Sequence, residues 1–477
     1  MSNYTAPDVY IKDKKASSKP STQISSSVGV LIGVARSGVA NVAKKVTSWT
    51  EFVSNYANGL DTPFTENSYL PYAVHGFFSN GGKQLYIGSV KKNGVKSTKT
   101  SNGYTATAIS EGEWGNLIKV SVKKSATYSE DYKVYDVTVS IGTSDTATIS
   151  EVSLADVNTR VLENYKVKQW LSEFKYENAE ATELTEEEFT LESGSEGDEL
   201  TDEDYIKALE MVDVIDDAMM IGIVGQTSKK VTEELLKYCE EKELFPIIDM
   251  PMGSSTEDTK AFRVTLDSFT GVLAHPWGKV KDPLTGNLKA VPTVGHLMGV
   301  YARVIESRGV YKAPAGIEAT VNGFVEMEYQ LSKTQIGYLN QAGVVSISAR
   351  PNVGIVVWGA RSLNSSDSTM KYVTDGLLNL TIKKALYNGT LFAVFEGNDP
   401  ALWSRVQAVC KGYLETLRTS GALKGTKDEA YFVTVDETNN TDETIDAGEL
   451  HIDIGYAPVK PAEFVIISLA HSIETQQ

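Results

Sequence analysis

The sequence is poor in the residues that cross-link a chain or bind metals. Its 477 residues include only two cysteines, Cys239 and Cys410, and five histidines. Two cysteines cannot supply a disulfide framework for a chain of this length, which indicates a reducing compartment. The histidines show neither H-x-x-x-H nor H-x-x-C spacing, so we expect no metal site.

Basic charge and long apolar runs are also scarce. The 45 Lys and Arg residues are outnumbered by 62 Asp and Glu, which gives a formal net charge of -17. This balance is opposite to that of a nucleic-acid-binding surface, so we expect no direct nucleic-acid partner. No apolar run approaches the roughly 20 residues that span a bilayer, and the N-terminus lacks the pattern of a secretory signal. We therefore expect that the protein is made in a cytoplasm and does not insert into a membrane.

Three residues stand in the chain order of a subtilisin triad: Asp61, His75 and Ser144. His75 lies in an aromatic-rich segment with helical spacing, whereas Ser144 follows an alternating strand with no helix behind it. A nucleophile and its base must lie within hydrogen-bond reach, and these surroundings do not favour that. We expect no catalytic residue, and a degenerate serine hydrolase remains an alternative function.

Residues 222–230, GIVGQTSKK, connect an apolar strand to a helix, as a phosphate-binding loop would. The spacing G-x-x-x-x-G-K-[ST] that such a loop requires is absent. A plain turn between strand and helix is the simpler interpretation, and no cofactor is expected.

The apolar content of 41% is enough for several hydrophobic cores. Continuous apolar runs at 28–35, 219–224 and 245–250 are typical of strands buried on both faces, and helical spacing lies between them. A Thr, Val and Tyr-rich region with period-two alternation interrupts this pattern, which predicts an inserted β domain. The expected boundaries are an N-terminal arm at 1–27, a discontinuous α/β domain at 28–90 and 200–362, an inserted β-sandwich with an acidic loop at 91–199, a C-terminal α+β domain at 363–457, and a C-terminal arm strand at 458–477.

The stretch 180–204 is heavily acidic and contains Glu186, Glu187 and Glu188 in succession. Its carboxylates lack the regular spacing of a calcium loop, so we interpret it as a solvated loop that faces outward. Within the C-terminal domain, spacing predicts helices at 372–387 and 399–417, followed by strands at 430–435, 449–456 and 463–469.

Segments spread over the whole chain resemble the contractile phage tail sheath family. They occur in the family's order. The segments are PDVYI at 7–11, with Asp8 where the family usually has glycine, VGVLIGVARSG at 28–38, YAVHGFFSNGG at 72–82, GEWGN at 112–116, GVYAR at 299–303, KAPAG at 312–316, WGARSL at 358–363, FEGNDPALW at 395–403, GALKG at 421–425, DETNNT at 436–441 and YAPVKPAEF at 456–464.

The resemblance implies a multidomain α/β and α+β protein. Its parts would be a subtilisin-like α/β core without protease chemistry, an inserted β-sandwich, and a C-terminal domain that faces an inner tube. The implied role is a structural subunit, not an enzyme, which polymerises as a helical sheath of stacked rings around the tail tube. That sheath would contract from a metastable state to drive the tube through the host envelope. The implied partners are further copies of the chain, the tube protein, and baseplate and terminator proteins, in a virion tail assembled in the host cytoplasm.

The same sheath role in an R-type bacteriocin or a related injection system remains an alternative. The family joins its subunits by terminal arms that add strands to neighbouring sheets. The candidate arm strands are Val9, Tyr10 and Ile11 at one end and Phe464, Val465, Ile466, Ile467, Ser468 and Leu469 at the other. The candidate tube contacts are Lys383, Lys384, Arg405 and Lys411.

Overall fold

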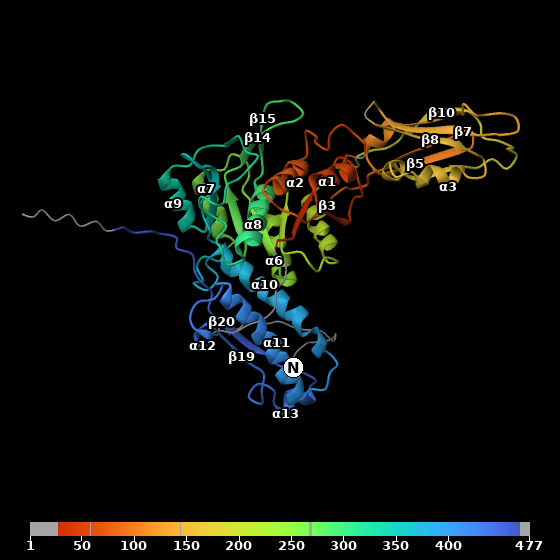
Figure 1. Ribbon diagram of the computed structural model, residues 1–477. Coiled ribbons are helices and arrows are strands. Elements are labelled where there is room, and N and C mark those ends of the chain that lie inside the picture. The colour runs from red at the N-terminus through yellow and green to blue at the C-terminus, as the bar shows by residue number, and fades with distance from the viewer. Residues whose placement is uncertain (1–26, 58, 144, 267–269, 468–477) are drawn as a thin grey trace, which may run out of the picture. The chain divides into compact units, whose positions relative to one another are not determined.

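The computed structural model describes residues 27–57, 59–143, 145–266 and 270–467 (Figure 1). The chain divides into two compact units. Of the described residues, the larger holds those in 27–307 and 314–376, and the smaller holds 308–313 and 377–467. Each unit is described separately.

The larger unit is built on an eight-stranded sheet with the strand order β18-β17-β13-β12-β11-β1-β3-β2. The six inner strands are parallel, and β2 and β18 pair antiparallel at the edges. The strands are β1 (Gly29–Gly33), β2 (Ala43–Val46), β3 (Leu85–Ser89), β11 (Met220–Ile223), β12 (Phe245–Asp249), β13 (Val272–His275), β17 (Val344–Arg350) and β18 (Gly354–Val357). The three apolar runs expected as buried strands coincide with β1, β11 and β12.

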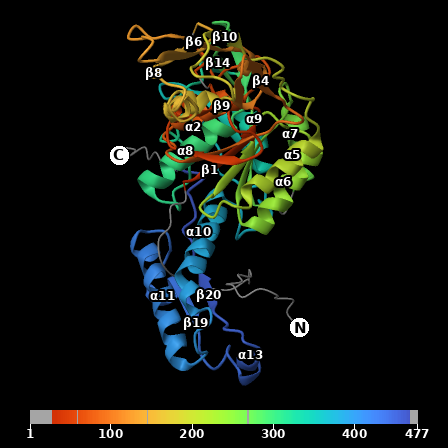
Figure 2. The same ribbon diagram turned by 90° about the vertical axis from the view of Figure 1, so that its right-hand side faces the viewer.

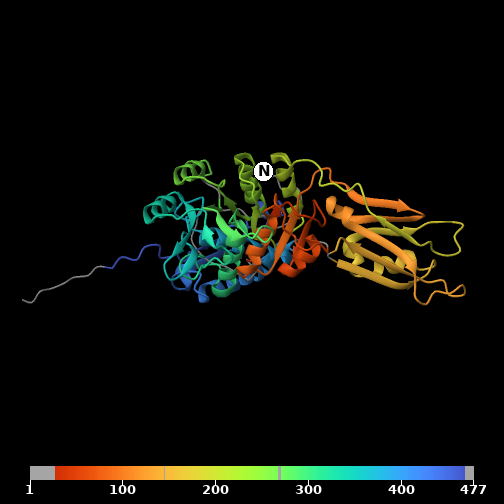
Figure 3. The same cartoon turned by 90° about the horizontal axis from the view of Figure 1, so that it is seen from above.

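Helices cover both faces of this sheet (Figure 3). On one face Val30 and Ile32 of β1 pack against Val231 and Leu235 of α6. On the other face the glycines of β1 admit helices α2 and α8, because a Cβ on Gly29 would lie 2.3 Å from Met298 Sδ. The helices of this part are α1 (Trp49–Tyr56), α2 (Leu70–Ser79), α5 (Asp202–Lys207), α6 (Lys229–Lys242), α7 (Thr256–Val264), α8 (Val294–Arg308) and α9 (Lys333–Gln341).

A three-stranded sheet also belongs to this unit, with the order β15-β14-β16. Its strands are β14 (Gly278–Lys281), β15 (Leu288–Val291) and β16 (Glu326–Met327). The turn between β14 and β15 is closed by Asp282, whose carboxylate accepts hydrogen bonds from Leu284 N and Tyr72 Oη.

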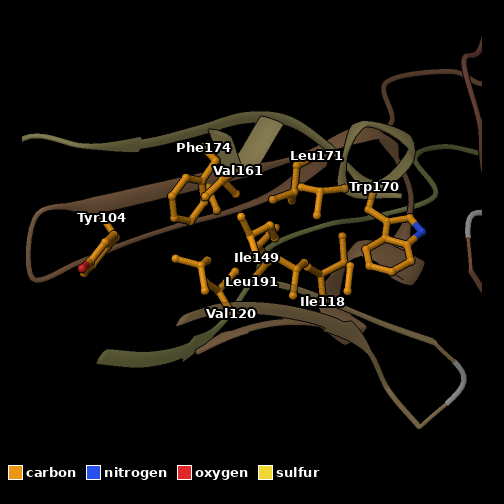
Figure 4. Packing of buried hydrophobic residues seen from close by; sticks show 14 of the residues in the cluster. Tyr104, Ile118, Val120, Ile149, Val161, Trp170, Leu171, Phe174 and Leu191 are labelled. Carbon is orange, nitrogen blue, oxygen red and sulfur yellow. The ribbon is translucent and has the colours of Figure 1, made fainter. Parts of the chain in front are cut away.

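Residues 96–190 form two antiparallel sheets, with the orders β10-β6-β7-β8 and β4-β5-β9. One hydrophobic cluster lies between them, and Figure 4 shows Ile118, Val120 and Phe174 within it. The strands are β4 (Lys96–Ser101), β5 (Tyr104–Glu111), β6 (Ile118–Lys124), β7 (Tyr135–Ile141), β8 (Asp145–Val152), β9 (Leu171–Tyr176) and β10 (Glu187–Thr190). Alternation of buried and half-buried residues along β5 and β7 matches one face packed in the core and one face nearer to solvent.

Two short helices complete this cluster: α3 (Val157–Glu163) and α4 (Val167–Trp170). Val157 and Val161 of α3 and Trp170 of α4 are buried in it. The helices therefore belong to the same core as the two sheets.

The expectation of a solvated loop throughout 180–204 is wrong. Glu187–Thr190 is strand β10, paired antiparallel with β6, and α5 begins at Asp202. Three of the carboxylates lie beside lysines while they stay partly exposed: Glu188 lies 2.6 Å from Lys119 Nζ, Glu192 lies 2.8 Å from Lys99 Nζ, and Glu196 lies 2.5 Å from Lys91 Nζ. Lys99 and Lys119 lie on β4 and β6 and Lys91 follows β3, all distant in sequence, so composition within the segment did not reveal them.

The smaller unit contains two long helices and a two-stranded sheet. The buried residues Leu402, Val406, Cys410, Tyr413 and Leu417 recur every three or four positions along α11, which packs against β19 (Figure 2). Asp399 caps α11 by accepting a hydrogen bond from Leu402 N at 2.8 Å. The elements are α10 (Val373–Thr390), α11 (Pro400–Thr419), α12 (Lys427–Ala430), α13 (Asp442–Asp446), β19 (Tyr431–Thr434) and β20 (Asp453–Tyr456).

Candidate assembly surfaces

The C-terminal segment of the smaller unit presents consecutive apolar side chains to solvent. After β20 the chain is held by hydrogen bonds from Lys424 N to Ala457 O and from Val459 N to Ala422 O. Residues 461–467 then form neither helix nor strand. The exposed fractions are 71% for Phe464, 82% for Val465, 88% for Ile466 and 76% for Ile467. An exposed apolar row of this length marks an interaction site.

The expected strand at 463–469 is therefore absent from residues 463–467 of the single chain. A strand needs a partner, and an arm strand would find it on another copy. Ser468 and Leu469 lie outside the described residues, as do Val9, Tyr10 and Ile11. The arm assignment stays a prediction.

The sheet in the smaller unit consists of β19 and β20, paired antiparallel from Tyr431 with Tyr456 to Thr434 with Asp453. Within the described residues it has only these two strands. Two-stranded sheets are marginal by themselves, and this one is supported on one side by α11.

The four basic residues proposed for tube contact are divided between two helices. Lys383 and Lys384 are half-buried on α10, and Arg405 and Lys411 are exposed on α11. Arg405 is engaged locally: its guanidinium lies 4.9 Å from the centre of the Phe392 ring and 3.9 Å from Glu396. Arg405 and Lys411 are six positions apart, so they lie on different faces of the helix. Their contact with a tube remains a prediction.

Sequence reasoning missed an aromatic residue in the loop between these helices. Phe395 is 89% exposed and has a φ of 67°. A bulky side chain in the left-handed region is strained, and such strain is typically retained at functional positions. The quoted motif FEGNDPALW contains this residue, but residue type alone does not indicate a left-handed backbone.

A second feature that the sequence did not reveal lies at the carboxyl end of β12. The Asp249 carboxylate accepts hydrogen bonds from Thr293 N and Val294 N, both at 3.0 Å, and from the Thr293 hydroxyl. It therefore caps the first turn of α8 across 44 residues of sequence. Burial raises the pKa of Asp249 to about 6, and these hydrogen bonds oppose that shift.

A polar cluster adjoins the end of the next strand, β13. His275 Nδ1 lies 3.3 Å from the Thr259 hydroxyl, and its Nε2 is hydrogen bonded to the Tyr329 hydroxyl, which also bonds to Ser254 O. Burial lowers the pKa of His275 to about 4, so the ring is neutral near pH 7. The cluster ties α7 and the chain before α9 to the sheet.

The residues considered for catalysis are not brought together by any contact in the structure. His75 lies on α2 with its ring edge-on to Trp49, at a centroid distance of 5.0 Å. Asp61 is exposed, and Ser144 lies outside the described residues. Among the residues that the structure describes, no group of three or more His, Cys, Asp or Glu side chains is arranged to hold a metal ion. No helix in the same set is long and apolar enough to cross a membrane.

The loop considered for phosphate binding is occupied by a carboxylate. Ser228, the residue before α6, donates a hydrogen bond to Asp202 Oδ2 at 2.5 Å, and its N bonds to Gln226 Oε1 at 2.9 Å. A negative charge beside the start of the helix opposes the binding of a phosphate.

These observations define a multidomain α/β protein whose exposed apolar terminus and small sheet suit it to assembly. The family model of the phage tail sheath protein central domain matches residues 198–363, and that of the phage tail sheath C-terminal domain matches residues 365–470. The chain belongs to the contractile phage tail sheath family. This family is structural, and the comparisons give no support to the serine-hydrolase alternative.

Curated relatives carry the same description. The tail sheath protein of Salmonella phage ViI is 25% identical over 221 residues, which are 46% of this chain and 34% of the relative. That of Escherichia phage P2 is 22% identical over 248 residues, which are 51% of this chain and 61% of the relative. The aligned part thus spans less than two thirds of these relatives.

Solved structures share the fold over nearly the whole chain. A sheath tail protein of Listeria innocua has a TM-score of 0.65 at 14% identity and covers 92% of this chain and 96% of its own. The sheath complex of an extracellular contractile injection system, solved in the contracted state, has a TM-score of 0.61 at 20% identity and covers 99% of each chain.

Proposed function

We propose that this chain is the subunit of a contractile tail sheath, a mechanical and structural protein that polymerises as a helical sleeve around an inner tube. The observation that carries the proposal is the family match, which extends through residues 198–363 and 365–470. On contraction the sleeve would drive the tube through the host envelope. No catalytic step is assigned to any residue.

The joints between subunits are strands exchanged between copies. The unpaired apolar segment at Phe464–Ile467 supplies main-chain donors and acceptors, and residues 9–11 supply them at the other end. The acceptor is the two-stranded sheet of β19 and β20, which gains support from each strand added. The sequence predicts flanks at 12–27 and 457–461 that let the bodies rotate and slide while the strands stay paired. At the C-terminal end Ala457 and Val459 are hydrogen bonded to Lys424 and Ala422, so this role falls to the residues after Val459.

The work of contraction comes from two packings of the same subunits. A gain of about a few kcal/mol per subunit, summed over many copies, is large, provided that a barrier holds the extended form. A trigger at the baseplate would release that barrier, because it need only favour the contracted packing locally.

The finer assignments are part of this proposal. The α/β core is subtilisin-like, and the domain limits are those expected from the sequence: 28–90 with 200–362, 91–199 and 363–457. The C-terminal domain faces the tube through Lys383, Lys384, Arg405 and Lys411. Further partners are the baseplate and tail terminator proteins, and the subunit is assembled in the host cytoplasm into a virion tail.

A phage tail is favoured over a headless device because the curated relatives aligned in sequence are phage tail sheath proteins. The injection systems share the fold at 18% to 20% identity. Electron microscopy of the intact particle distinguishes the two, since only the phage carries a head.

Deleting residues 1–20 tests the arm model. The truncated chain is expected to remain a folded monomer, because the removed stretch is rich in Lys, Ser and other polar residues and could not form a core of its own, and to form no contractile sleeves. Circular dichroism and negative-stain microscopy measure the two properties. Normal contractile sleeves from the truncated chain would refute the arm model.

A further inference from the structure

The two sheets at 96–190 have four outer strands, and two of them are closed by the chain itself. On one side β4 and β10 end the two sheets. The chain that follows β10 bridges to β4, with Thr98 N bonded to Glu192 O at 3.0 Å and Val95 N bonded to Ser195 O at 3.1 Å. A further strand therefore cannot add between these edges.

On the other side the outer strands are β8 and β9. The sequence of β8, DTATISEV, contains no lysine or proline, and its charged residues, Asp145 and Glu151, lie toward its two ends, so its middle carries none of the side chains that usually blunt an edge strand. Its threonines are exposed and have high strand propensity. A strand of this kind is a ready acceptor for an extended segment.

Helix α3 engages the edge of β8 through Arg160. Its Nη1 donates to Glu151 O at 2.6 Å, and its Nη2 donates to Ser150 O at 3.0 Å. These two residues form a bulge opposite Asp136, and Glu151 has a φ of 54°. The guanidinium thus donates hydrogen bonds to both carbonyl groups of the bulge, where the pairing of β8 with β7 is irregular.

The same helix engages the edge of β9 through Asn158. The Asn158 side chain accepts from Tyr176 N at 2.7 Å and donates to Tyr176 O at 3.3 Å. A side-chain amide that bonds both backbone groups of one residue replaces the pair of bonds that a neighbouring strand would make. One helix therefore holds backbone groups on both free edges.

We propose that α3 guards these edges: Arg160 and Asn158 keep the C-terminal segment of another copy from adding to β8 or β9. The occupant excluded is the segment beginning at Phe464, because it is apolar and 71% to 88% exposed over Phe464–Ile467. The inference rests on the proposed function, in which that segment is a donor strand. By closing the edges of β8 and β9, Asn158 and Arg160 leave the sheet of β19 and β20 as the acceptor of the C-terminal segment.

The test compares N158A/R160A with T159A/E163A in the full chain. Thr159 and Glu163 are exposed on the same helix, and the Thr159 hydroxyl bonds within the helix to Asp156 O. Val157 and Val161, which anchor α3 in the core, are unchanged in both variants. Unassembled protein is treated with a lysine-reactive cross-linker and analysed by mass spectrometry and light scattering.

N158A/R160A is expected to form oligomers with a cross-link between Lys460, next to the donor segment, and Lys166 or Lys175, next to β8 and β9. When residues 463–477 are also removed, so that no strand replaces Asn158, faster amide exchange at Tyr176 is expected as well. The control and the wild type should show neither change. Removing residues 463–477 from N158A/R160A should abolish the oligomers and the cross-link.

A folded N158A/R160A chain without these oligomers would overturn the proposal, as would oligomers that survive the removal of 463–477. If the double variant does not fold, N158D/R160K replaces it, because this pair loses the amide donor and the paired guanidinium bonds with little change in side-chain size. If the proposed function were wrong, the result would be different: chains that lack both arms would still form normal sleeves.

Discussion

Asp249 joins two parts of the sheet domain through one carboxylate. It ends β12 and receives the N–H groups of Thr293 and Val294 at the start of α8. A buried carboxylate that is hydrogen bonded by a helix N-terminus holds that helix in place, but its charge is costly without water. The hydrogen bonds of Asp249 therefore stabilise the start of α8, whereas burial of its charged form is destabilising.

The Asp249→Asn variant tests this compromise by its pH dependence. Burial raises the pKa of Asp249 in the folded state from 3.8 to about 6. The protonated side chain therefore contributes its full stabilisation below the ordinary pKa of 3.8, and this contribution is lost as the pH rises through the folded-state pKa. The difference of about two pKa units corresponds to about 3 kcal/mol. From about pH 4 to about pH 8, the wild type should lose this free energy of unfolding relative to the variant. Urea unfolding at both pH values measures the difference, and a pH-independent difference would contradict the assignment.

Glycines set how closely α2 and α8 approach. A Cβ on Gly295 would lie 2.1 Å from Ala73 O, a backbone atom that cannot rotate away. We expect Gly295→Ala to lower the free energy of unfolding by about 3 kcal/mol through overpacking.

The matched control is Gly337→Ala on α9, where a Cβ meets nothing within 4 Å. This change should be neutral or stabilise by up to about 1 kcal/mol, since alanine favours helix and restricts the unfolded chain. Thermal unfolding compares the two variants. Equal effects would show that the helix contact is not tight at Gly295.

At the scale of elements, apolar runs in the sequence predicted the buried strands correctly, whereas the sequence did not indicate which strands pair. The runs now seen as β1, β11 and β12 are buried on both faces, so their sequences carry the signal by themselves. Helices α10 and α11 are found where spacing predicts them. In contrast, β10 is acidic and is recognisable only once β6 lies beside it, with Lys119 of β6 opposite Thr190 and in an ion pair with Glu188.

The candidate sites follow the same division. The apolar composition of 464–469 indicated an interaction segment, whereas its conformation depends on a partner that one chain lacks. Asp249 and Arg160 act on residues 44 and about ten positions away, and no local pattern encodes those contacts. The lysine and arginine candidates on α10 and α11 stay predictions, because neither the half-buried Lys383 and Lys384 nor the exposed Arg405 and Lys411 make a contact that identifies a tube.

Proline substitutions test whether the terminal segment pairs as a strand. Successive N–H groups of a strand point to opposite sides, so along one edge only one of Val465→Pro and Ile466→Pro removes an intersubunit hydrogen bond. That variant should raise the concentration needed for assembly about tenfold. Val465→Ala and Ile466→Ala control for the lost apolar side chains. Equal effects of the two prolines, as measured by sedimentation, would contradict pairing along one edge.

At the scale of the whole molecule, the net charge of -17 makes free copies repel one another. Much of the acidic surface is paired within the chain, as at Glu188, Glu192 and Glu196. Assembly must then be driven by contacts that are indifferent to charge. Backbone pairing of apolar terminal strands is such a contact, and it persists while the bodies change their packing.

A cryo-electron microscopy reconstruction of sleeves grown from this chain would show whether terminal strands join the subunits. Residues 464–469 of one copy are expected to form a strand beside β19 or β20 of a neighbouring copy. Density that instead folds 464–469 onto its own chain, or leaves β19 and β20 as a two-stranded sheet in the sleeve, would contradict it.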